Sequence, residues 1–162
     1  MKSDGPPRAD LPRSIGPGVA LWMVTRSSTA RMEQDALARA RILVLDNDPT
    51  ISLVIHRVLG AAYDIHDMTD AKEAIALIRG GTRFDAILCD LLMPGLGGRD
   101  FYRQLLAADW RAAAGVIFIT GAAGLPEMKA FLSTLSNPVL EKPFTRAALR
   151  AVVQSVSARN GR

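Results

Sequence analysis

The chain of 162 residues has one cysteine, Cys89, so it can form no intramolecular disulfide and no paired-cysteine metal site. Its longest apolar runs fall well short of the roughly 18 residues that a membrane span needs. No apolar stretch near Met1 is long enough for a secretory signal. We therefore expect a protein of the reducing cytoplasm with no membrane partner.

The excess of basic over acidic residues is also small. The formal net charge is +4, and it is divided evenly between the first 40 residues and the remainder. Nucleic-acid binders usually gather their basic residues into a patch or stripe. Because no such cluster is present, we expect no nucleic-acid partner.

The first 40 residues differ in texture from the rest. They contain four prolines and no sustained apolar period, which is typical of a disordered or linker segment. Their apolar patch, Val19–Val24, is either a sticky spot or a short docking element anchored by Trp22. We expect an N-terminal extension over 1–40, one domain over 41–158 and a short tail over 159–162.

From Arg41 onward, short apolar runs alternate with amphipathic segments. The expected strands cover residues 42–45, 63–68, 86–89, 115–120 and 138–140, and the expected helices cover 49–59, 70–79, 98–108, 126–135 and 145–158. Such alternation predicts an α/β fold with a parallel sheet between two helical layers. We expect a doubly wound, flavodoxin-like sheet of five strands in the order 2-1-3-4-5, with five helices.

Polar side chains follow the ends of these strands. Asp46, Asn47 and Asp48 follow the first strand, Asp90 the third, Thr120 the fourth and Lys142 the fifth. In open α/β sheets, ligands bind beyond the carboxyl ends of the strands. Adjacent carboxylates repel unless a cation lies between them, and oxygen ligands favour Mg²⁺. The set suits phosphoryl transfer, with Asp90 as nucleophile and Lys142 and Thr120 facing the phosphoryl oxygens.

Four separated motifs, ILVLDNDP, DAILCDLLMPGLGG, VIFITG and LEKPF, resemble the CheY-like receiver domains of bacterial two-component response regulators. The resemblance implies that Asp90 is phosphorylated by a histidine kinase or phosphotransfer protein in the presence of Mg²⁺. It implies metal ligation by Asp46, Asn47, Asp90 and the backbone carbonyl of Leu92. Thr120 and Lys142 would then contact the phosphoryl group, and Pro143 would follow a cis peptide bond.

The sequence departs from the family pattern at two positions, and two further positions bear on the lifetime of the acyl phosphate. Asn47 stands where the family carries a second acid, so we expect weakened Mg²⁺ binding, unless Asp48 turns inward to compensate. Val139 stands at a switch position that is often aromatic, which removes coupling through an aromatic rotamer. Leu92 and Ala122 stand where the family orients an attacking water, so we expect slow autohydrolysis of the acyl phosphate.

The leading hypothesis is a signalling receiver that is not an enzyme beyond self-catalysed phosphotransfer and slow autodephosphorylation. Its phosphorylation would change affinity for an unknown downstream protein, or for a second copy, through the face formed by 126–135, 138–140 and 145–158. A non-phosphorylated pseudo-receiver that binds partners constitutively is the alternative, and Asn47 keeps it open. A metal-dependent hydrolase is a third reading, which lacks a visible acid/base residue.

Overall fold

The computed structural model describes residues 39–121 and 123–161. The expectations for residues 1–38, including the docking role of Trp22, and for Ala122 lie outside these ranges. The strands are β1 (Arg41–Leu45), β2 (Asp64–Met68), β3 (Ala86–Asp90), β4 (Val116–Thr120) and β5 (Val139–Glu141). The helices are α2 (Pro49–Leu59), α3 (Ala71–Arg79), α4 (Gly98–Ala108), α5 (Trp110–Ala114), α6 (Pro126–Leu132) and α7 (Arg146–Asn160).

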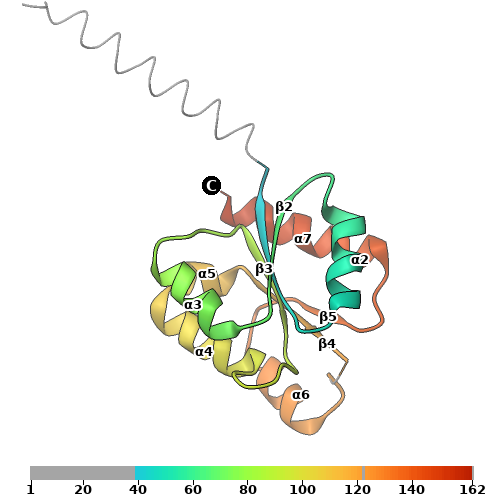
Figure 1. Ribbon diagram of the computed structural model, residues 1–162. Coiled ribbons are helices and arrows are strands. Elements are labelled where there is room, and N and C mark those ends of the chain that lie inside the picture. The colour runs from blue at the N-terminus through green and yellow to red at the C-terminus, as the bar shows by residue number, and fades with distance from the viewer. Residues whose placement is uncertain (1–38, 122, 162) are drawn as a thin grey trace, which may run out of the picture. The chain divides into compact units, whose positions relative to one another are not determined.

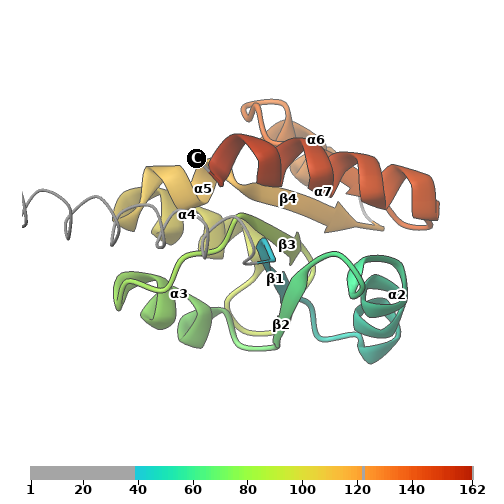
Figure 2. The same cartoon turned by 90° about the horizontal axis from the view of Figure 1, so that it is seen from above.

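The strands form one parallel sheet in the order β2-β1-β3-β4-β5, as the sequence predicts. Helices α2 and α7 cover one face, and α3, α4 and α5 cover the other, as Figures 1 and 2 show. The fold is therefore the predicted three-layer α/β arrangement, with β3 at its centre.

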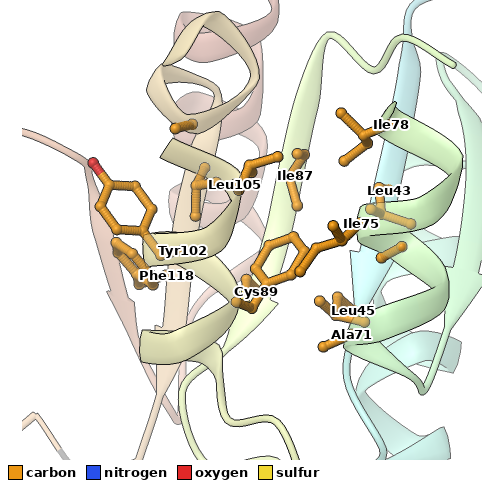
Figure 3. Packing of buried hydrophobic residues seen from close by; sticks show 14 of the residues in the cluster. Leu43, Leu45, Ala71, Ile75, Ile78, Ile87, Cys89, Tyr102, Leu105 and Phe118 are labelled. Atoms are coloured by element: carbon orange, nitrogen blue, oxygen red, sulfur yellow. The ribbon is translucent and has the colours of Figure 1, made fainter. Parts of the chain in front are cut away.

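The core is split between the two faces because successive residues of a strand point in opposite directions. On β1, Leu43 and Leu45 pack toward α3 and α4, whereas Ile42 and Val44 pack toward α2 and α7. Figure 3 shows the first cluster, in which Cys89 lies among these leucines and Phe118. All five residues of β3 are buried, which explains its continuous apolar run.

One helix was missed by the sequence analysis, which expected five helices; the described residues form six. The additional helix, α5, has only five residues, which is too short a segment to show the apolar period that marks a helix in a sequence. The carboxylate of Asp109 accepts hydrogen bonds from the backbone N–H groups of Arg111 and Ala112. A second difference is that α6 ends at Leu132 rather than at Leu135.

Hydroxyl groups explain the early end of α6. Ser133 donates a hydrogen bond to the carbonyl oxygen of Ala130, and Thr134 donates one to that of Phe131. Side chains that bond locally to the backbone in this way compete with continuation of a helix. At the other terminus of the domain, α7 continues to Asn160, two residues into the segment expected to be a tail.

Candidate functional site

The register of the sheet brings two acidic side chains to the same level. Leu45 on β1 pairs with Cys89 on β3, so the residues that follow them, Asp46 and Asp90, come level at the carboxyl edge. Both acids are nearly buried, with 5% and 7% of their surfaces exposed. Two buried carboxylates on neighbouring strands are costly unless a cation compensates them.

Lys142 supplies that cation in this structure. It follows β5, and its Nζ atom donates hydrogen bonds to Oδ2 of Asp46 and to Oδ2 of Asp90, each at 3.0 Å. Burial lowers the pKa of Lys142, but the hydrogen bonds that it donates to Asp90 and Asp46, together with the charges of these two acids, outweigh burial, so the pKa is raised. The ammonium group is therefore held in its charged form between the two carboxylates.

Backbone groups fix the remaining carboxylate oxygens. Oδ1 of Asp46 accepts a hydrogen bond from the N–H of Asp48 at 2.8 Å, and Oδ1 of Asp90 accepts one from the N–H of Leu92 at 3.0 Å. These bonds set the orientation of both acids before any ligand arrives, which is the preorganisation that electrostatic catalysis uses.

The glycines after β3 allow the chain to turn this closely around Asp90. Gly95 has a φ of +76°, a left-handed conformation that favours glycine. A β-carbon at Gly98 would collide with the carbonyl oxygen of Asp90, so the first residue of α4 must lack a side chain. The glycines of the GLGG motif thus allow the start of α4 to pack closely against the end of β3.

Asp48 does not turn inward toward the site. It is the N-cap of α2, and its exposed carboxylate accepts a hydrogen bond from the N–H of Thr50 at 2.8 Å. This bond to the Thr50 backbone is the main cause of the lowered pKa of Asp48. Asn47, between the two acids of this loop, is exposed. The compensation that the sequence left open is therefore not adopted, because capping α2 engages Asp48.

The remaining predicted residues lie around the same edge. Thr120 is fully buried at the end of β4 and pairs with Glu141, the residue before Lys142. The Lys142–Pro143 peptide bond is cis, the geometry expected from the family resemblance. Val139 on β5 has 37% of its surface exposed, and Leu92 has 50%.

The donor set suits a hard divalent cation. Mg²⁺ is commonly held by one or two carboxylates while several waters or substrate oxygens complete its shell. Asp46 and Asp90 would provide the carboxylates, and the amide of Asn47 and the carbonyl of Leu92 would add neutral oxygens. Among the described residues, no group of three or more Asp, Glu, His or Cys side chains could hold a metal ion, so a metal here would depend on neutral oxygens and water as well as on the two carboxylates. The residues therefore fit Mg²⁺, with two charged ligands rather than three.

A family model for the response regulator receiver domain matches residues 42–154. Among curated proteins, the DNA-binding response regulator MtrA of Mycolicibacterium smegmatis is 32% identical over 125 residues, covering 75% of this chain and 52% of that protein. The transcriptional regulatory protein TcrA of Mycobacterium tuberculosis is 27% identical over 120 residues, covering 74% and 46%. The chain thus spans about half the length of these curated relatives.

Two solved structures extend the comparison. The receiver domain of the sensor histidine kinase PA1611 from Pseudomonas aeruginosa, solved with a magnesium ion coordinated in its active-site cleft, has a TM-score of 0.66 and 28% identity, covering 75% of this chain and 99% of that one. The receiver domain of Francisella response regulator 1452 has a TM-score of 0.63 and 26% identity, covering 75% and 98%. No described helix has the length and apolarity that crossing a bilayer demands.

Proposed function

Because this chain belongs to the response regulator receiver domain family, we propose that it accepts a phosphoryl group on Asp90 from a histidine kinase or phosphotransfer protein. The observation that carries the proposal is the ammonium of Lys142 placed 3.0 Å from a carboxylate oxygen of both Asp46 and Asp90. In this arrangement the carboxylate of Asp90, at the end of β3, is held in one orientation beside the positive charge of Lys142.

The transfer step uses an oxygen of Asp90 as nucleophile. That oxygen forms a bond to phosphorus, and the bond from phosphorus to the donor breaks with its electron pair leaving on the donor group. The Leu92 N–H holds the carboxylate in place, and Lys142 neutralises charge on the transferred phosphoryl oxygens. The hydroxyl of Thr120 contacts another of these oxygens in the modified state. Asp46, Asn47, Asp90 and the Leu92 carbonyl would hold Mg²⁺, which would supply additional charge neutralisation.

The output is a change in protein affinity through α6, β5 and α7, and this face also serves any homodimer. None of the residues of α6 is fully buried, and the helix is attached through the half-buried Met128, Phe131 and Leu132. A loosely attached helix beside a site that carries about 1.5–2 negative charges once it is phosphorylated is suited to a two-state response. Since Val139 is aliphatic, the response does not depend on an aromatic rotamer at that position.

Incubation of the full chain with acetyl phosphate and MgCl₂, followed by intact-mass and peptide analysis, tests the proposal. We expect one added phosphoryl group on Asp90, lost in EDTA and in Asp90→Asn, and retained in the exposed control Asp100→Asn. An unmodified wild-type protein at high Mg²⁺ would contradict the proposal and support the pseudo-receiver that Asn47 keeps open. Modification that survives in Asp90→Asn would also contradict it.

The DNA binding named for the MtrA relatives is not part of this proposal. The chain matches about half of their length, and the receiver-domain family model covers residues 42–154 of this chain. The proposed cytoplasmic location and the proposed kinase partner rest on family membership alone. The fold does not specify which kinase acts on this chain, so that kinase has to be found by testing phosphoryl transfer from candidate donors.

A further inference from the structure

A second concave site lies at the end of the sheet opposite to Asp90. We call it the basal cleft. It has a volume of about 630 Å³. Its lining residues come from the end of α3, the loop before β3, helix α5 and the last turn of α7, and Figure 1 shows how these helices are arranged. Its principal lining residues are Ile78, Arg83, Phe84, Trp110, Arg111 and Arg159. The volume falls in the range of small-molecule sites, roughly 300–1,000 Å³.

Hydrogen bonds fix the floor of the basal cleft. Oδ2 of Asp85 accepts a bond from the N–H of Arg41 at 2.7 Å, which ties the starts of β1 and β3 together. The side-chain amide of Asn160 donates to the carbonyl oxygen of Asp85 at 3.2 Å, which ties the end of α7 to the same point. A floor assembled in this way needs no ordering when a ligand binds, so little free energy is lost on binding.

The wall formed by α5 is fixed as well. Asp109 accepts hydrogen bonds from the first N–H groups of α5, and its carboxylate also pairs with the guanidinium of Arg83. Arg83 is therefore already compensated. Asp85, the acid of the cleft, accepts a hydrogen bond from the backbone N–H of Arg41, which fixes the position of its carboxylate.

The unpaired groups of the basal cleft have a distinct chemistry. Among the residues that the structure describes, no carboxylate lies within ion-pair distance of Arg111 or Arg159. Trp110 has 65% of its surface exposed, and the guanidinium of Arg111 lies 5.4 Å from the centre of its ring. Guanidinium groups bind phosphate or carboxylate in a planar fork, and an exposed indole offers a stacking surface.

We propose that the basal cleft binds a small aromatic anion of nucleotide size, with its ring against Trp110 and its phosphate toward Arg111 and Arg159. Neither feature alone would specify this ligand, because an exposed tryptophan accepts many apolar groups and two arginines accept many anions. Their adjacency on a fixed, concave wall is what selects a molecule that carries both a planar ring and a negative charge.

Isothermal titration of the full chain in EDTA tests this with AMP and GMP as probes, and with adenosine and inorganic phosphate as their separate halves. We expect saturable nucleotide binding with a Kd on the order of 0.1 mM and at least about tenfold weaker binding of either half. Emission of Trp110 in a Trp22→Phe background should change over the same concentration range.

Matched variants locate the site. Trp110→Ala and Arg159→Gln should each weaken nucleotide binding about tenfold. The controls Leu106→Ala, an exposed leucine of α4, and Arg146→Gln, at the other end of α7, should leave it unchanged. Circular dichroism of each variant separates loss of binding from loss of folding. Asp90→Asn should bind nucleotide as the wild type does, which keeps this test independent of the proposed phosphorylation.

Four results would overturn the proposal. One is the absence of saturable binding of either nucleotide at millimolar concentration. Another is phosphate binding as tightly as AMP, which would mean that the ring contributes nothing. The third is nucleotide affinity that is unchanged in both Trp110→Ala and Arg159→Gln, which would place binding elsewhere. Tighter binding of poly-glutamate than of AMP would likewise reject the small ligand in favour of an acidic protein segment.

Discussion

Replacing Lys142 with methionine removes the one positive charge between Asp46 and Asp90. The side chain of Lys142 is 21% exposed, whereas those of the two acids are 1% and 9% exposed. Loss of one partner from a buried ion pair costs about 3–5 kcal/mol. Because Lys142 is partly reached by solvent, we expect a loss of about 2–3 kcal/mol in the free energy of unfolding in metal-free buffer.

The same reasoning predicts that Mg²⁺ restores the variant. Two uncompensated carboxylates attract a dication more strongly than a pair already neutralised by an ammonium group. A ligand that binds only the folded state stabilises it by about 2.7 kcal/mol at a hundredfold excess over its Kd. Millimolar MgCl₂ should therefore raise the unfolding free energy of Lys142→Met by more than it raises that of the wild type.

Urea denaturation followed by circular dichroism, with EDTA or with MgCl₂, measures both effects. The control Lys129→Met makes the same chemical change at an exposed lysine of α6 and should cost less than ~0.5 kcal/mol. In an Asp90→Asn background, Lys142→Met should cost less than in the wild type, because one carboxylate is already neutral. Equal stability of Lys142→Met and wild type in EDTA, or an equal gain from Mg²⁺ in both, would refute the reasoning.

Further predictions concern the same site and its surroundings. Asn47→Asp adds a third charged ligand and should tighten Mg²⁺ binding about tenfold by calorimetry; unchanged affinity would mean that position 47 does not reach the metal. Burial, with the charges of Asp90 and Asp46, raises the pKa of the Cys89 thiol, so Ellman's reagent should modify native protein on the order of 100-fold more slowly than unfolded protein. Rapid modification of the native thiol would argue against its burial. The pKa of Lys142 is raised above its ordinary 10.5, so the stability from its ion pairs is complete below that pH and is lost as pH rises through the folded-state value. Alkaline melts should show a steeper loss in wild type than in Lys142→Met. Finally, Leu92→Asn offers a polar group to orient water and should speed decay of the acyl phosphate about tenfold. The decay is measured as loss of the added phosphoryl mass over time, and an unchanged rate would show that Leu92 does not limit hydrolysis.

Strands β1, β3 and β4 could be predicted because each is a short apolar run with a polar residue at or directly after its end, and burial on both faces requires such runs. Strand β2 could be predicted from the alternation of apolar and polar residues in DIHDM. The order of the strands followed from the alternation with helices. Helix α5 could not be predicted in the same way, since WRAAA has no apolar period over five residues. Its position depends on Asp109, which caps the helix and also reaches Arg83 across 26 residues of chain.

The acidic edge was predictable from one rule, that parallel strands bring their carboxyl ends to the same side. That rule places Asp46, Asp90 and Lys142 together, and the structure adds that one ammonium contacts both acids. It does not decide which acid of a loop points inward, because the start of α2 engages Asp48 as its cap. The basal cleft left no signal in the sequence, since its residues come from separate segments with no shared motif.

The ion pairs of Lys142 also have a consequence for the order of biosynthesis. Lys142 is separated from Asp46 by 96 positions and from Asp90 by 52 positions, and it follows the last strand of the sheet. A ribosome therefore completes Asp46 and Asp90 long before it completes their counter-charge. Until β5 docks, the two acids of a nascent chain lack the Lys142 counter-charge, and their repulsion opposes the pairing of β1 with β3 unless a cation such as Mg²⁺ lies between them. The last strand to emerge from the ribosome is thus the one that makes the acidic edge stable.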